Sequence, residues 1–226
     1  MSFKAKAYIM GMIIIGLVLI ARTTMNLEWT NPWLYVTALL GAVLQTLKVD
    51  GPNDKTNYSI AWFVYGFAFI ALGLEIAIFV ILIAHIMEWI WHKYPWYIQS
   101  FNIGNHMVSI YLAGLVFEMA SRGSQTPNLD DTFGLMAANV VFVLGNHFLV
   151  GLVVKLARGQ GFAESGVFEF LTLFLDFTVL SMGSVTALVW FKYPFAALLN
   201  ILPLYLLYNA LQVPSLKRQL QDLKRN

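Results

Sequence analysis

Apolar residues follow one another along this chain in long runs, broken by short clusters of charged residues, prolines and small polar residues. A helix needs about 20 apolar residues to cross the roughly 30 Å hydrocarbon core of a bilayer. The runs predict eight helical spans, at about 7–22, 33–48, 58–72, 74–93, 98–120, 131–157, 166–191 and 194–212. We therefore expect an all-α, polytopic transmembrane helix bundle, with residues 1–213 forming a single domain.

The third and fourth spans belong to one apolar stretch of about 35 residues, which is too long for a single crossing. Within it, Gly73 lies two residues before Glu75, and a glycine beside an acidic residue predicts a tight turn. This division leaves a short third span of about 15 residues, which we expect to be tilted, half-buried or re-entrant.

The basic residues divide unevenly between the two ends of the predicted spans. With the N-terminus in the cytoplasm, eleven of the fourteen lie inside: Lys4, Lys6, Lys48, Lys55, Lys93, Lys155, Arg158, Lys217, Arg218, Lys224 and Arg225. The outer set consists of Arg22, Arg122 and Lys192. Cytoplasmic loops carry the excess of Lys and Arg in membrane proteins. The even count of spans then places both termini in the cytoplasm.

Composition supports the same class of protein. Apolar residues make up 59% of the chain and charged residues 12%, against about 25% charged in soluble domains. A net charge of +2 gives no support for binding nucleic acid. The chain contains no cysteine, which excludes disulfides and thiolate metal sites. We expect a multi-pass protein of the inner (cytoplasmic) membrane, with the lipid bilayer as its main partner.

The tail at 214–226 predicts a short, basic, amphipathic helix. Leu216, Leu220 and Leu223 fall at i, i+4 and i+7, and so form one apolar stripe. Such a helix either lies on anionic lipid or docks a membrane or cytoplasmic protein partner through the three leucines.

Ionisable residues inside spans are costly, so each is a candidate functional residue. His85, His106, His147 and Asp176 lie on four different predicted helices. At about 1.5 Å per residue, each lies roughly 12–15 Å from the cytoplasmic end of its helix. We therefore expect the four side chains to share one level of the bundle and to form part of a ligand-binding layer.

A short motif occurs twice, at Phe101–His106 and Phe142–His147, with the pattern Phe-x-x-Gly-Asn-His. The glycines predict a close approach of the fifth and sixth helices, across which the following Asn and His can hydrogen-bond. The asparagines that we include in the candidate layer are Asn102, Asn105 and Asn146, within the two copies of the motif, and Asn139, just before the second copy. Three interpretations stay open: a polar packing seam, a pocket for a small polar molecule, and a metal or haem held by His106 and His147.

A second polar set follows one face of the fourth helix, with His85, Glu88 and His92 at i, i+3 and i+7. The two histidines are about 10 Å apart, too far to share one ion. We expect Glu88 to bond locally and His92 to face the headgroups. No nucleotide-binding loop, serine-hydrolase elbow or His-Glu-x-x-His motif occurs, so we expect no enzymatic activity.

Part of the chain resembles the multi-span N-terminal membrane regions of bacterial cyclic-di-GMP signalling proteins that carry GGDEF or HD-GYP catalytic domains. The resemblance is carried by Pro95-Trp96-Tyr97, Phe101-Asn102, Asn146, and a last helix that passes through Tyr208 into Pro214. It implies that Asn102 and Asn146 belong to the functional layer. In those proteins the last helix leads to a catalytic domain; here we expect a stand-alone membrane module whose output another chain supplies, if any.

A weaker resemblance, from Ser59 to Gly73 and the long apolar helix that follows, is to the substrate-binding S components of energy-coupling-factor vitamin transporters. Our interpretation is a non-enzymatic sensor-like protein or accessory subunit that binds a small ligand or a partner membrane protein through the polar layer. The alternatives are the membrane component of a solute (vitamin-like) transporter, and a haem- or metal-binding redox subunit. The sequence does not identify a cofactor.

Overall fold

The computed structural model describes residues 1–50, 57–121 and 129–225. Within these residues the chain is almost entirely helical, with one pair of two-residue strands. The elements are α1 (Phe3–Asn26), α2 (Pro32–Thr46), β1 (Val49–Asp50), β2 (Asn57–Tyr58), α3 (Ala61–Ala71), α4 (Leu74–His92), α5 (Trp96–Ala120), η1 (Leu129–Asp131), α6 (Thr132–Arg158), α7 (Phe170–Trp190), η2 (Pro194–Asn200) and α8 (Ile201–Arg225). The helices coincide closely with the predicted apolar runs.

Six helical segments of the described chain are long and apolar enough to cross a membrane. They are Phe3–Asn26, Leu74–His92, Trp96–Ala120, Thr132–Arg158, Phe170–Trp190 and Pro194–Val213. The chain is thus a helical, multi-pass membrane protein by the length and composition of its helices. The remaining two, α2 and α3, are shorter, with 15 and 11 residues. The predicted number of eight crossings stays a prediction.

Local signals set the ends of several helices. Ser2 caps α1, its Oγ accepting a hydrogen bond from the backbone N–H of Ala5 at 3.1 Å. The predicted turn between the third and fourth spans is confirmed: Gly73 has φ +96°, a conformation that L side chains rarely adopt. That residue separates α3 from α4, so the 35-residue apolar stretch becomes two helices.

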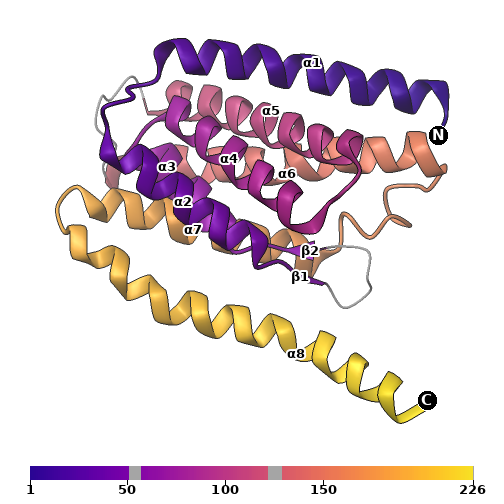
Figure 1. The fold of residues 1–226 in the computed structure, drawn as a ribbon. Helices are drawn as coiled ribbons and strands as arrows, with labels where there is room; N and C mark the ends of the chain where they lie inside the picture. Colours follow the sequence, from indigo (N-terminus) through magenta and orange to yellow (C-terminus); the bar gives the residue numbers. More distant parts are fainter. Residues whose placement is uncertain (51–56, 122–128, 226) are drawn as a thin grey trace.

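The helices run back and forth along one axis, and both chain ends lie at the same end of the bundle (Figure 1). At its centre is α3, whose residues Ala61 to Ile70 are all buried. It packs most extensively against α7. Gly66 of α3 and Gly183 of α7 form the crossing: a Cβ on Gly183 would overlap the backbone carbonyl of Phe63. Small residues let two backbones approach this closely in a membrane.

Gly104, the glycine in the first copy of the repeated motif, lies at a different helix crossing from the predicted crossing of the fifth and sixth helices. Gly104 on α5 lies against α1, where a Cβ would overlap the backbone carbonyl of Met12, and a Cβ on Gly16 would lie 3.0 Å from Gly104 Cα. Gly145 on α6 makes an ordinary approach of 3.6 Å to Ser109 of α5. The expectation that both glycines bring α5 and α6 together is therefore wrong for Gly104, because α1 occupies that face of α5.

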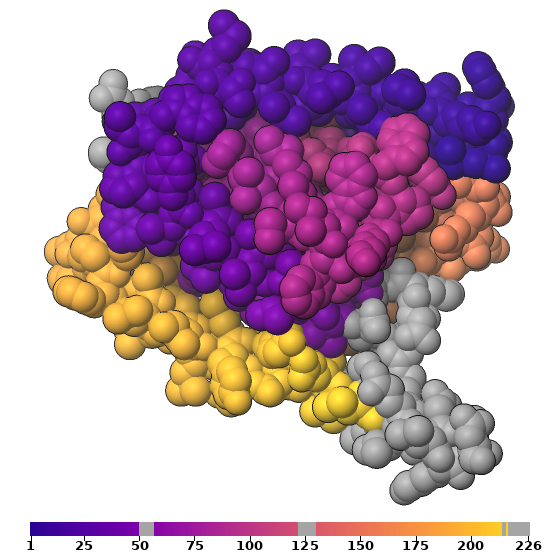
Figure 2. Space-filling model, in the orientation of Figure 1, coloured from indigo at the N-terminus to yellow at the C-terminus, as the bar shows by residue number. Residues whose placement is uncertain are grey.

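The C-terminal helix α8 lies along one side of the bundle, with contacts to β1 and η2 (Figures 1 and 2), and its Leu204 and Leu207 pack against the hydrophobic core. None of its apolar window Pro194–Val213 is buried. Residues 214–225 continue α8 as its last turns. Leu216 is exposed, as a docking residue would be, whereas Leu220 and Leu223 lie outside the side chains that the structure describes. Docking through these leucines stays a prediction.

Candidate functional site

A polar cavity of about 210 Å³ lies inside the bundle, toward the end that carries the β1–β2 pair. Its walls come from α2, α3, α4, α5, α6, α7 and the connections beside them. The lining residues are Gln45, Lys48, Asn57, Ser59, Trp62, His85, Asn102, His106, Asn146, His147, Val150, Val167, Thr172 and Asp176. All four residues that we expected to share one level, His85, His106, His147 and Asp176, thus lie around one space.

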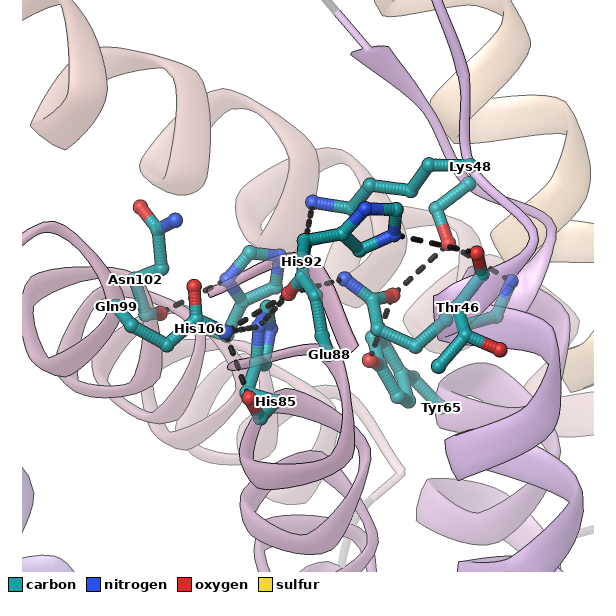
Figure 3. A network of polar contacts seen from close by, with 12 residues as sticks. Thr46, Lys48, Tyr65, His85, Glu88, His92, Gln99, Asn102 and His106 are labelled. Atoms are coloured by element: carbon teal, nitrogen blue, oxygen red, sulfur yellow. Dashed lines mark hydrogen bonds and ion pairs between the residues drawn. The ribbon is translucent and has the colours of Figure 1, made fainter. Parts of the chain in front are cut away.

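Glu88 of α4 is the centre of a buried polar network beside the cavity (Figure 3). Its Oε2 accepts hydrogen bonds from His85 Nδ1 at 2.8 Å, Gln99 Nε2 at 2.9 Å and Gln45 Nε2 at 3.0 Å. Its Oε1 forms an ion pair with the ammonium group of Lys48. Three donors and a cation around one fully buried carboxyl fit an ionised carboxylate. The network ties α2, α4 and α5 together.

Gln45 extends this network from α2 to the central helix. Its Oε1 accepts from the hydroxyls of Ser59, at 2.8 Å, and Tyr65, at 3.1 Å. Both amide atoms of Gln45 are therefore used, which fixes the orientation of its side chain. The polar wall of the cavity is held in place on this side by hydrogen bonds rather than by apolar packing alone.

Two imidazoles lie next to each other on this wall, from α4 and α5 (Figure 3). The ring centroids of His85 and His106 are 4.5 Å apart. His106 Nδ1 donates to the backbone carbonyl of Asn102 at 3.0 Å, and His85 Nδ1 donates to Glu88. Each ring therefore keeps Nε2 without a hydrogen-bond partner among the described residues. In the neutral imidazole such a nitrogen is an acceptor.

The opposite wall carries a buried histidine–aspartate pair from α6 and α7. His147 Nε2 lies 2.8 Å from Asp176 Oδ2, and both residues are about 6% exposed. His147 Nδ1 donates to the backbone carbonyl of Val167 at 2.7 Å. Because a carbonyl can only accept, one proton must lie between Nε2 and the carboxyl group. The pair carries no net charge in either arrangement of that proton.

The indole of Trp62, from α3, lies between the two histidines of the repeated motif. Its ring centroid is 5.7 Å from that of His106 and 6.4 Å from that of His147. Both ring nitrogens of His147 are already hydrogen-bonded. A metal held jointly by His106 and His147 does not fit this geometry. Among the described residues, no group of three or more His, Asp or Glu side chains is placed to hold a metal ion.

The four candidate asparagines have different surroundings. Asn102 and Asn146 line the cavity, whereas Asn105 is fully buried and its side-chain amide has no hydrogen-bond partner in the described part of the chain. Asn139 lies farther along α6, where it donates to Ser181 and accepts from Ser184, both at 3.1 Å. Asn139 therefore joins α6 to α7 by hydrogen bonds and does not reach the cavity.

No hydrogen bond joins the side chains of the two Gly-Asn-His segments in the described structure. His106 bonds within its own helix, and His147 bonds to α7 and to the connection before it. The interpretation as a polar packing seam between the two segments is therefore not supported. The interpretation as a pocket agrees with where His106, Asn146 and His147 lie.

Several lining residues were not among the predicted site residues: Gln45, Lys48, Asn57, Ser59, Trp62 and Thr172. Serine, threonine and glutamine also hydrogen-bond between packed helices where no ligand binds, and Lys48 looked like a cytoplasmic flanking lysine. Glu88 does bond locally to His85, as expected, but it also bonds to α2 and α5. His92 is exposed, and its ring nitrogen donates to the carbonyl of Thr46 at 3.3 Å.

Comparisons with known proteins give no further guide to this site. No protein-family model matches the chain, and neither the curated proteins nor the solved structures contain a significant match.

Proposed function

We propose that this membrane protein binds a small polar ligand in the cavity that the helices α2 to α7 line. In this proposal the protein acts as a sensor-like module or accessory subunit rather than as an enzyme. The observation that carries the proposal is the convergence of polar side chains from five helices, with Trp62 from a sixth, on one space of about 210 Å³. Polar groups inside a membrane are costly and mark functional sites.

Unpaired polar atoms around the cavity support a bound occupant. His85 Nε2 and Asn146 Nδ2 are buried, and neither has a hydrogen-bond partner among the described residues. More than nine in ten buried polar groups in proteins are paired, with protein or with ordered water. A polar cavity with such groups in its walls holds water or a ligand that completes their bonds.

The sensor-like role is supported by the resemblance to the membrane regions of GGDEF and HD-GYP signalling proteins. Two residues that carry it, Asn102 and Asn146, line the cavity. In this proposal α8, which contacts β1 at the cavity end of the bundle and keeps most of its surface exposed, is the element through which ligand binding acts on a partner.

The proposal is tested by filling the cavity. Thr172→Phe places a ring in the space, because the Thr172 side chain is 2% exposed and lines the cavity. The matched control is Leu171→Phe, one residue earlier, where the side chain is 49% exposed. We expect mass spectrometry of heat extracts to find a small molecule with the wild-type protein and with Leu171→Phe, and to find it lost with Thr172→Phe. The same small-molecule content in all three proteins would contradict the proposal.

A further inference from the structure

The cavity reaches the surface at one end of the bundle. Four lining residues belong to the connections at that end: Lys48, Asn57 and Ser59 between α2 and α3, and Val167 between α6 and α7. Asn57 is exposed, and the Lys48 side chain is 17% exposed. None of the lining residues comes from the described connections at the opposite end. The opening therefore faces water at the end where the chain begins.

The inner end of the cavity is closed by aromatic side chains. Trp62 and Phe142 meet edge to face, with ring centroids 5.0 Å apart, and Tyr65 is completely buried behind His106 at 6.2 Å. Farther along the same axis, the packing around Gly66 and Asn139 leaves no space for a water molecule. A molecule in the cavity thus cannot pass through to the other end of the bundle in this structure.

The chemistry of the walls limits what the cavity can hold. Lys48 offers hydrogen-bond donors, whereas His106 Nε2 and Asp176 Oδ1 offer acceptors that no described side chain uses. Each charged group already faces a group of opposite charge or shares its proton, in the pairs Lys48–Glu88 and His147–Asp176. The cavity volume of about 210 Å³ lies below the roughly 300–1,000 Å³ of pockets for drug-sized ligands, so a molecule that it encloses is small.

We propose that the ligand is a small water-soluble molecule with both hydrogen-bond donors and acceptors, and that it enters from the aqueous side on which both chain termini lie. By the distribution of basic residues, that side is the cytoplasm. This inference rests on the proposed function, and it adds the ligand class and the side of entry. In this proposal the protein is a receptor for a solute of the cytoplasm and not for a solute outside the cell.

The absence of cysteine from the chain allows a direct test. Single cysteines are placed in the full-length protein, and their reaction with a charged, membrane-impermeant methanethiosulfonate is followed in inside-out and right-side-out membrane vesicles. Asn102→Cys and Thr172→Cys report on the cavity. Leu144→Cys, two residues from Asn146 and 45% exposed on the outside of α6, is the lipid-facing control. Lys4→Cys and Glu28→Cys, both exposed, mark the two ends of the bundle.

We expect Asn102→Cys to react from the same side as Lys4→Cys, and at least about 10-fold faster than Leu144→Cys, because thiolates form in water and not in lipid. Glu28→Cys should react from the other side. Thr172→Cys repeats the measurement with a nearly isosteric side chain, in case Asn102→Cys does not fold. Reaction of both cavity cysteines from the Glu28 side, or reaction no faster than that of Leu144→Cys from either side, would overturn the inference.

The ligand class is tested on the same variant with named probes. We expect glycerol and urea, which are small and carry donors and acceptors, to slow labelling of Asn102→Cys in a concentration-dependent way without affecting Lys4→Cys. Protection by short-chain lysolipid and by neither solute would overturn the ligand class. If a small molecule is lost with Thr172→Phe but the cavity cysteines react from the Glu28 side, the proposed function stands and this inference fails.

Discussion

Glu88 shows how one carboxylate can organise a buried site. It is 0% exposed, and its two oxygens together face three hydrogen-bond donors, from α2, α4 and α5, and the ammonium group of Lys48, which follows α2. Taking an ion pair out of water costs several kcal/mol per ion, and hydrogen bonds to the remaining lone pairs offset that cost. The Gln45 and Gln99 amides have this role, so the pair and its partners form one unit.

Replacing that carboxylate should be strongly destabilising. Glu88→Gln removes the partner of Lys48 and places an amide N–H₂ among groups that are themselves donors. Breaking a buried pair by removing one partner costs about 3 kcal/mol or more, which we expect as the loss in free energy of unfolding measured in mixed micelles. Glu75→Gln, on the same helix and partly exposed, is the control and should change stability by less than about 0.5 kcal/mol. Equal effects of the two changes would contradict the role of the network.

The crossing of α3 and α7 depends on the absence of side chains at two positions. At Gly183 the backbone of Phe63 occupies the place of a Cβ, and at Gly66 the Ser184 Oγ lies 2.7 Å from the Cβ position. The α3 helix has 11 residues and no lipid-facing side, so it cannot move away from α7 without disturbing other helices. Among the glycines of the described chain, Gly183 would bring an added Cβ closest to another atom, so we expect this crossing to tolerate a side chain poorly.

Adding one methyl group at the crossing tests this. We expect Gly183→Ala to lower the free energy of unfolding by about 2 kcal/mol or more, because overpacking forces the two backbones apart. The control is Gly11→Ala on α1, where nothing lies within 4 Å of the added Cβ, and where alanine should stabilise the helix by up to about 1 kcal/mol. Thermal unfolding in detergent measures both, and a stable Gly183→Ala protein would show that the helices can separate at no cost.

Most of the helices, but only part of the site, could be predicted from the sequence, and the physical reasons differ. Apolar runs, and residues such as Gly73 that separate two helices, act locally, so they predict the ends of the helices to within a few residues. The common level of His85 and Asp176 followed from the helical rise alone. The roles of Gln45 and Trp62 depend on which helices are neighbours, and Gly104 packs on α1 instead of α6. Apolar helices carry little information about their neighbours, because lipid and protein are similarly apolar.

For the whole molecule, the positions of the two chain termini predict its orientation in the membrane. The N- and C-termini lie at one end of the bundle, and most of the basic residues in the sequence are predicted to face that side (Figure 1). Alkaline phosphatase fused after residue 226 should be inactive and a fluorescent protein there bright, whereas phosphatase inserted between residues 27 and 31 should be active. An active phosphatase at the C-terminus would invert the orientation and, with it, the side from which the cavity opens.

The short, enclosed helix α3 also constrains how the protein is made. Its 11 residues extend about 16 Å, half of what a bilayer requires, so α3 cannot be held in the membrane as an independent span during synthesis. Its main partner, α7, begins about a hundred residues later, at Phe170. At about 5–20 residues per second, several seconds pass before that partner leaves the ribosome. The cavity, which has walls from both helices, is thus completed late, as one of the final steps of biogenesis.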